Sequence, residues 1–372
     1  MWDKTPGMYC FARAGWNNQQ VTKNCGVLPF LFHQMYGWRA VMAGPRIEAD
    51  YPGLAYVPGL EMDFLADART ESALAYLEAH QMDIDVLVFH GVFPNYIPLA
   101  ARYKELRPDG KIYLELDANA FYEDQLEWTK PEAMAFLQSC DVIGASCHAM
   151  QRHIGQKWPV VVEYLPNGFY DFTGSSQPMQ AQNFAAKEKV LLSVGRIGSP
   201  EKQNEILLEA FAAVADRLPD WRVELVGPVE EGFRAYLQGY REQHPQAYER
   251  VSLPGNVPDK KRLYAYYRRA AVFVLTSPRE GGTPNVVAEA LAHGCYMLTT
   301  EIDAAGDVTD QGRCGQSFPI GDAASLRGIL LTVCPDGERL QQGGRHAAAY
   351  APRNFDFRRI VARLHGMLMG EV

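Results

Sequence analysis

Two glutamates, Glu280 and Glu289, flank a glycine-containing segment whose residue types suit the binding of a sugar. A loop carboxylate accepts hydrogen bonds from sugar hydroxyls, and the glycines between the two acids let the backbone approach a ligand closely. The acids can also be read as a solvated loop residue and a surface helix residue. Glu289, however, is flanked by Val287, Ala288 and Leu291, and an acid in so apolar a helix usually has a partner.

Two cations, Arg196 and Lys202, stand in the turn after the apolar run that ends at Val194. Backbone N–H groups at the start of a helix attract anions, and the two cations can neutralise the oxygens of a departing diphosphate. A strand-to-helix turn with two solvated cations is the alternative, because such turns are frequent in α/β sheets. These residues alone leave both interpretations open.

The second half of the chain has the alternation that must position these groups, with short apolar runs separated by amphipathic helices. Predicted strands cover residues 190–194, 223–226, 251–253, 271–275 and 295–298. The residues 204–218 form one predicted sheet-covering helix. A second helix is predicted to begin at Pro284 behind a Thr283 cap and to stop at Gly294, so Glu280 lies in the loop and Glu289 in the helix.

The first half repeats the pattern. Predicted strands lie near residues 9–11, 40–43, 86–89, 112–116 and 142–145, and predicted helices near 26–36, 70–80, 96–106 and 131–139. The fold class is therefore α/β, with two Rossmann-like doubly wound parallel-sheet domains facing a cleft, which is the default place for a site.

The turn signals at 166–168 and the polar stretch 173–178 mark the domain boundary. We expect an N-terminal acceptor-side domain over 1–168, a linker over 169–187 and a C-terminal donor-binding domain over 188–350. Residues 351–372 form a predicted C-terminal helix that packs back toward the N-terminal domain.

The composition narrows the class of protein. The net charge is −8, with 13 Lys and Arg against 21 Asp and Glu up to residue 180 and 23 against 23 afterwards. An acidic first half argues against nucleic acid as a partner. No apolar run is long enough to span a bilayer and no secretory signal is present, so we expect a soluble, cytoplasmic protein, with peripheral membrane contact left open. The seven cysteines have neither zinc nor disulfide spacing.

Three further patterns carry no predicted chemistry. Asp83 and Asp85 form an Asp-x-Asp pair, but it precedes a strand rather than ending one, so we expect no metal. Cys147 and His148 are adjacent and cannot act as nucleophile and base on one helix face. The basic, tyrosine-rich residues 260–269 are interpreted as a helix surface, because the second half as a whole is neutral.

The second half resembles the donor-binding domain of the GT-B glycosyltransferases, specifically glycosyltransferase family 4. The motifs that carry the resemblance run in the family's order over about residues 140–320, namely Pro166-Asn167-Gly168, Val194-Gly195-Arg196 with Lys202, Ala210-Phe211, residues 221–227, Pro254-Gly255-Asn256-Val257, and Glu280-Gly281-Gly282 onward to Glu289 and Gly294. The resemblance implies a retaining glycosyltransferase that uses a UDP- or GDP-linked sugar as a substrate and needs neither a cofactor nor a metal. Its expected role is glycan, polysaccharide or glycoconjugate biosynthesis.

The resemblance also assigns roles by position. Arg196 and Lys202, beside Gly195, would bind the donor diphosphate, and Glu289 the ribose. Asn256 lies in a loop that influences the choice of base and sugar. The donor sugar would be held by Glu280 and the backbone of Gly281, Gly282, Thr283, Pro284 and Asn285. The family's paired glutamates enclose seven residues and these enclose eight, so we expect either a one-residue bulge, which the glycines favour, or a displaced Glu280.

The first half resembles the family only in outline. Gly15 occupies the place of the glycine-rich loop after the first strand, which in the family faces the donor phosphates and the acceptor. His90 ends a predicted strand and could orient a hydroxyl, although a lone His there is more often structural. Asp117 stands where many relatives have a His. It could accept a hydrogen bond from the acceptor or the donor sugar, or simply be a turn residue.

Two other functions compete with sugar transfer. A sugar-nucleotide 2-epimerase has the same architecture and binds the same diphosphates, although the glutamate segment argues against it. A non-catalytic partner subunit would explain the additional residue between the glutamates and the missing His. The acceptor is an unidentified hydroxyl compound, and the acidic first half favours a soluble glycan, small molecule or protein over a lipid.

Overall fold

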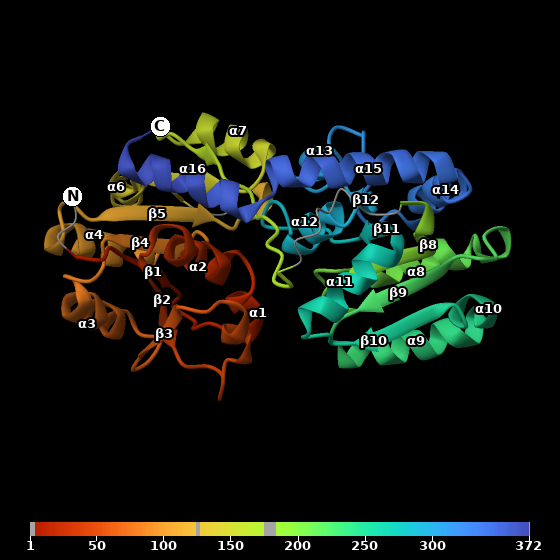
Figure 1. Cartoon of the computed structure of the whole chain (residues 1–372), viewed down its shortest axis with the longest axis horizontal. Helices are drawn as coiled ribbons and strands as arrows, with labels where there is room; N and C mark the ends of the chain where they lie inside the picture. The colour runs from red at the N-terminus through yellow and green to blue at the C-terminus, as the bar shows by residue number, and fades with distance from the viewer. Residues whose placement is uncertain (1–3, 124–126, 175–183, 372) are drawn as a thin grey trace. The chain divides into compact units, whose positions relative to one another are not determined.

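The computed structural model describes residues 4–123, 127–174 and 184–371. The chain divides into two compact units, Met1–Tyr170 together with Asp356–Val372, and Asp171–Phe355. Most of the predicted linker, residues 175–183, lies outside the described residues. Each unit is an α/β domain built on its own parallel sheet, drawn from red to yellow for the first and from green to blue for the second (Figure 1).

The first unit contains a seven-stranded parallel sheet in the order β3-β2-β1-β4-β5-β6-β7. Its strands are β1 (Gly7–Phe11), β2 (Arg39–Pro45), β3 (Leu60–Leu65), β4 (Val86–His90), β5 (Lys111–Leu116), β6 (Val142–Ala145) and β7 (Glu163–Tyr164). The central strands β1 and β4 are entirely buried, as expected when helices cover both faces of a parallel sheet.

The helices of this unit connect successive strands. They are α1 (Asn18–Val21), α2 (Asn24–Tyr36), α3 (Thr70–His80), α4 (Tyr96–Leu106), α5 (Ala120–Glu123), α6 (Pro131–Ser139) and α7 (His148–Lys157), with a 3₁₀ turn at Pro52–Tyr56. The last helix of the chain, α16 (Phe357–Met369), also belongs to this unit and packs against α2. It is the blue helix that lies beside α2 in Figure 1.

The second unit contains a six-stranded parallel sheet in the order β10-β9-β8-β11-β12-β13. Its strands are β8 (Glu188–Val194), β9 (Arg222–Val226), β10 (Val251–Gly255), β11 (Ala270–Leu275), β12 (Tyr296–Thr300) and β13 (Gly315–Phe318). Numbered within the unit, this order is 3-2-1-4-5-6, which is the Rossmann order. The predicted pair of Rossmann-like parallel domains is therefore confirmed.

The helices of the second unit are α8 (Asn204–Ala212), α9 (Glu231–Gln243), α10 (Pro245–Tyr248), α11 (Lys260–Arg269), α12 (Asn285–Ala292), α13 (Ala305–Val308), α14 (Ala323–Val333) and α15 (Gly337–Asn354). The predicted single helix over 204–218 is wrong in its second part, because α8 ends at Ala212 and a 3₁₀ turn follows at Ala215–Arg217. Pro219 lies two residues beyond this turn, and a proline disfavours a helical conformation in the residue before it.

The core of the second unit lies between the sheet and these helices. Leu207, Ala210, Phe211 and Val214 are buried against Leu191, the apolar face that the helical spacing predicts. Burying the leucine, phenylalanine and valine side chains among these stabilises the unit by about 1.5–3 kcal/mol each. The sheet is therefore a rigid platform for the loops at its carboxyl edge.

Candidate functional site

The loops after β8 and β11 lie side by side at the carboxyl edge of the second sheet. The two strands are neighbours, and the chain leaves them in opposite directions, β8 toward β9 and β11 toward β12. Such a switch point opens a crevice beyond the strand ends, and ligands of open α/β sheets bind there. The loop after β8 carries Arg196 and Lys202, and the loop after β11 carries Glu280.

Glycines let the backbone in this region pack without side chains. A Cβ atom on Gly227, which follows β9, would lie 1.8 Å from the carbonyl oxygen of Gly195, and its φ of +145° already favours glycine. On Gly195 the nearest neighbour of a Cβ would be the Lys202 side chain, 3.4 Å away. Gly195 and Lys202, which the sequence assigned to one site, are therefore in contact range.

Lys202 and Glu280 form an ion pair between the two loops. The lysine Nζ also lies 3.4 Å from the Ser277 hydroxyl, and the Thr276 hydroxyl donates a 2.6 Å hydrogen bond to the Lys202 carbonyl oxygen. The lysine and glutamate side chains are 18% and 15% exposed. The predicted diphosphate-binding cation and the predicted sugar-binding acid thus neutralise each other, and both remain partly exposed to solvent.

Arg196 does not join this pair. Its guanidinium lies 3.3 Å from Glu201, and both side chains are more than half exposed. An exposed ion pair of this kind contributes little to stability, so the arginine side chain can turn toward a ligand at small cost.

The segment between the two glutamates differs in one detail from the expected geometry. The N-cap residue of α12 is Pro284 rather than Thr283. The backbone of Pro284 is extended, and its carbonyl oxygen accepts a 3.0 Å hydrogen bond from the Val287 N–H. Thr283, one residue earlier, is fully buried. Gly282 has a φ of +88°, an unusual torsion of the kind that a one-residue bulge requires. The helix begins at Asn285 and ends before Gly294, whose φ is +67°.

Glu289 is a nearly buried acid, as its apolar neighbours on α12 suggested. The Tyr267 hydroxyl donates a 2.8 Å hydrogen bond to its Oε2 atom, and Lys260 Nζ lies 3.9 Å from its Oε1 atom. The interpretation of residues 260–269 as a helix surface is therefore wrong for one face of α11, where Tyr264 and Tyr267 are buried. Residues 260, 264 and 267 follow the i, i+4, i+7 spacing of a single helix face, and this signal was present in the sequence.

Asn256 lies in the exposed loop that follows β10. The preceding Gly255 has a φ of +76°, and its carbonyl oxygen accepts a 2.9 Å hydrogen bond from the Gly227 N–H. The loops after β9 and β10 are thereby held together at the same sheet edge as the cations.

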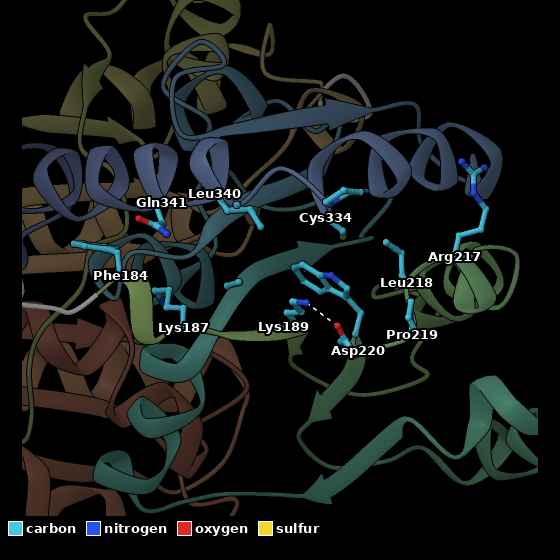
Figure 2. A pocket seen from close by; sticks show the side chains of 14 residues that line it. Phe184, Lys187, Lys189, Arg217, Leu218, Pro219, Asp220, Cys334, Leu340 and Gln341 are labelled. Carbon is cyan, nitrogen blue, oxygen red and sulfur yellow. Dashed lines mark hydrogen bonds and ion pairs between the residues drawn. The ribbon is translucent and has the colours of Figure 1, made fainter.

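A pocket of about 350 Å³ opens at the opposite, amino edge of this sheet (Figure 2). Its two lysines already have partners. Lys187 donates to the carbonyl oxygens of Tyr267 and Ala270 at 3.2 and 2.7 Å and so caps the end of α11, while Lys189 pairs with Asp220 at 2.8 Å, the dashed line in Figure 2. None of the predicted donor-binding residues lines this pocket.

The switch point of the first unit, between β1 and β4, contains Gly15 and His90. Gly15 has a φ of +79°, and a Cβ atom there would lie 2.3 Å from the Pro45 carbonyl oxygen, so the loop requires glycine. His90 is buried, and neither of its ring nitrogens is accessible to solvent. The Trp16 ring packs edge-on against the His90 ring, with 5.4 Å between the ring centroids. Asp117 is exposed beyond the end of β5.

The sequence did not indicate that Glu115 is the partner of His90, or that Asn24 in turn binds Glu115. His90 Nδ1 lies 2.5 Å from Glu115 Oε2, and Asn24 donates a 2.6 Å hydrogen bond to Glu115 Oε1. Burial opposes charge on His90, but Cys25 and Glu115 raise the pKa of His90 well above its ordinary value. Burial also opposes charge on Glu115, but His90 and Asn24 lower the pKa of Glu115. His90 is therefore one half of a buried ion pair, and Trp16 of the loop after β1 packs on its ring.

Within residues 4–123, 127–174 and 184–371, no three His, Cys, Asp or Glu side chains are grouped as metal ligands. Asp85 instead pairs with Arg107 at 2.8 Å and accepts a 2.9 Å hydrogen bond from the Gly7 N–H. All seven cysteines are free thiols. Over the same part of the chain no helix is long and apolar enough to cross a membrane.

Comparison with known proteins finds a family model that matches part of the second unit and solved structures that share the fold of the whole chain. Residues 188–335 match the family model of the glycosyl transferases group 1. Sucrose-phosphate synthase from Thermosynechococcus elongatus has a similar structure, with a TM-score of 0.74 at 16% identity over 99% of this chain and 100% of its own. The structure of HepE from Anabaena in complex with UDP has a TM-score of 0.75 at 17% identity, over 98% of this chain and 100% of HepE. The chain has the GT-B fold of glycosyltransferases.

Sequence relatives agree with the GT-B fold and are consistent with family 4. A phosphatidyl-myo-inositol mannosyltransferase of Mycobacterium leprae is 28% identical over 202 residues, which are 54% of this chain and 51% of the relative. The enzyme of the same name from Mycolicibacterium smegmatis is 25% identical over 54% of this chain and 50% of the relative. The chain thus spans about half the length of the curated relatives that it matches.

Proposed function

We propose that this protein is a retaining glycosyltransferase that moves a sugar from a UDP- or GDP-linked donor to an acceptor hydroxyl without an essential metal. The observation that carries the proposal is the meeting of Lys202 and Glu280 at the switch point of the second sheet. A cation and an acid, reachable by solvent and backed by glycines that admit a ligand to the backbone, suit a diphosphate joined to a sugar.

In the proposed reaction the nucleoside diphosphate leaves while Lys202 and Arg196 stabilise its growing negative charge. The acceptor hydroxyl attacks the same face of the sugar, and the leaving phosphate takes the hydroxyl proton. Electrostatic stabilisation of the leaving group is the largest contribution of the protein in this scheme. In this proposal Glu289 holds the ribose, and Glu280 with residues 281–285 meets the sugar. The loop of Gly15 serves the donor phosphates and the acceptor, and Asp117 accepts a hydrogen bond from the acceptor or the donor sugar.

The acceptor is proposed to be a hydroxyl compound of glycoconjugate biosynthesis. The relatives' names make phosphatidyl-myo-inositol a lipid candidate, whereas the acidic first half favours soluble acceptors. Parallel assays with phosphatidylinositol vesicles and with soluble glycans separate the two classes, because only the correct class accelerates release of the nucleoside diphosphate.

Product analysis with UDP- and GDP-linked sugars tests the proposal. Without an acceptor we expect slow release of the nucleoside diphosphate, a released sugar that first has the donor's anomeric configuration, and the same rate in EDTA. An epimerised nucleotide sugar would identify a 2-epimerase. Tight nucleotide binding with no release, with or without an acceptor, would identify a non-catalytic subunit.

A further inference from the structure

Glu289 is a carboxylate that water solvates poorly. Its side chain is 11% exposed, and the α12 residues around it, Val287, Ala288, Ala290 and Leu291, are buried. Moving an ionised carboxylate out of water is costly unless it is paired and hydrogen-bonded. The groups that contact Glu289 therefore determine where its remaining lone pairs point.

Those groups come from one face of α11. Lys260 and Tyr267 are seven residues apart and occupy the same side of the helix, as two helical turns require. Tyr267 donates to Oε2 at 2.8 Å, and Lys260 Nζ stands 3.9 Å from Oε1, so each carboxylate oxygen has its own partner. Lys260 is 12% exposed and lies 5.2 Å from the centre of the Phe172 ring, which limits the freedom of its ammonium group.

The ionisation of the neighbouring groups fits a fixed donor and a fixed cation. Burial, reinforced by Glu289, raises the pKa of Tyr267 well above its ordinary value, so its hydroxyl keeps its proton. Burial lowers the pKa of His293, which stacks on Tyr267, to about 4, so this histidine is neutral at pH 7. Lys260 is thus the cation that faces Glu289, and Tyr267 is its neutral donor.

We propose that Tyr267 and Lys260 are positioning residues that turn Glu289 into a receptor for the two vicinal hydroxyls of a ribose. A carboxylate oxygen has two acceptor sites. Oε2 therefore keeps one beside the Tyr267 hydrogen bond, and Oε1, which Lys260 approaches only to 3.9 Å, also keeps an acceptor site. Two parallel acceptors match the 2′- and 3′-hydroxyls of a ribonucleotide and discriminate against a 2′-deoxyribonucleotide. The inference rests on the proposed donor function and names the part of the donor that α11 controls.

The test compares UDP and GDP with their 2′-deoxy forms by calorimetry on the full chain. The variants are Tyr267→Phe and Lys260→Met. The matched controls are Tyr266→Phe, a tyrosine on the same helix that packs on Arg269, and Lys261→Met, the next lysine along. Melting temperatures without ligand verify that each variant is folded. If one of the two test variants does not fold, the other still tests the proposal.

We expect the wild type and both controls to bind the better ribonucleotide at least tenfold more tightly than its deoxy form. Tyr267→Phe and Lys260→Met should weaken the ribonucleotide about tenfold and change the deoxy form little, so the preference collapses. Equal weakening of both forms, or an unchanged preference, would overturn the positioning role while leaving the donor function intact. If neither UDP nor GDP binds the wild type, the proposed function itself fails.

Discussion

The ion pair between Lys202 and Glu280 neutralises the cation that we propose binds the donor diphosphate. At the proposed site, a diphosphate therefore competes with Glu280 for Lys202. This competition separates two roles for Glu280 that the sequence cannot distinguish, namely a counter-ion of Lys202 and a direct contact of the donor sugar.

Replacing Glu280 with Gln is expected to tighten binding of UDP or GDP by about fivefold, or about 1 kcal/mol, because the phosphate oxygens lose their competitor. Calorimetry with Glu301→Gln as control, an exposed acid beyond β12 at the same edge, separates this effect from a change in net charge. Weaker binding of the free nucleotide to the Glu280→Gln variant than to the wild type would contradict the counter-ion role.

The buried pair of His90 and Glu115 gives the first unit a pH-dependent stability. The pKa of Glu115 is lower in the folded protein than in the unfolded chain, where it is about 4.3. Ionised Glu115 therefore stabilises the fold above about pH 4.3, and this stabilisation is lost as the pH falls through the folded-state pKa. The pKa of His90 is higher in the folded protein than in the unfolded chain, so protonated His90 stabilises the fold fully below about pH 6.5, and this stabilisation is lost as the pH rises through the folded-state pKa. Both contributions are therefore present between about pH 4.3 and 6.5.

Glu115→Gln is expected to lower the free energy of unfolding by about 3–5 kcal/mol in that window, because it leaves a buried imidazolium without its carboxylate. The difference from wild type should shrink as the pH rises above about 6.5, which thermal melts from pH 4 to 9 would show. The exposed Glu132→Gln is the control. A difference that does not vary with pH would contradict a charged pair.

At the scale of elements, the turns after β8 and β9 approach each other closely at the sheet edge where we propose that the nucleotide binds. Gly227→Ala would place a methyl group 1.8 Å from the Gly195 carbonyl oxygen and force the two turns apart. We expect a loss of about 1–3 kcal/mol in stability and loss of nucleotide binding.

Gly239→Ala is the matched control for that change, since it lies inside α9 with nothing within 4 Å of the added Cβ and should be neutral or slightly stabilising. Melting temperatures and calorimetry measure both variants. A Gly227→Ala protein that binds nucleotide as tightly as the wild type would show that the turns do not form the site.

The elements that the sequence predicted well are those with a strong helical repeat or a buried apolar run. Helices α3, α4 and α6 have the predicted bounds, and β6 begins and ends as predicted. The missed strands β3, β7 and β13 are all at sheet edges. An edge strand has one unpaired side, so it can be short or carry exposed acids, as Glu61 does in β3, and its apolar signal is weak.

At the scale of the whole molecule, the pair of parallel α/β domains and the GT-B fold followed from motif order and alternation. Lys202, Glu280 and Glu289 were chosen as candidates because each stands in a distinctive local setting, and their roles stay predictions. Their partners were not found, because the pairing of Glu289 with Tyr267 depends on how α11 packs beside α12, and that of His90 with Glu115 on the register of two adjacent strands. Local sequence carries little of that information.

The central claim is that the loops after β8 and β11 bind the diphosphate of a nucleotide sugar. Its most direct test is calorimetric binding of UDP- and GDP-linked sugars to the wild type, Lys202→Ala and Lys189→Ala, the last being a lysine of the opposite sheet edge that pairs with Asp220. We predict that wild type and Lys189→Ala bind one donor alike, and that Lys202→Ala binds it at least tenfold more weakly. Equal affinity of Lys202→Ala and the wild type would contradict the account.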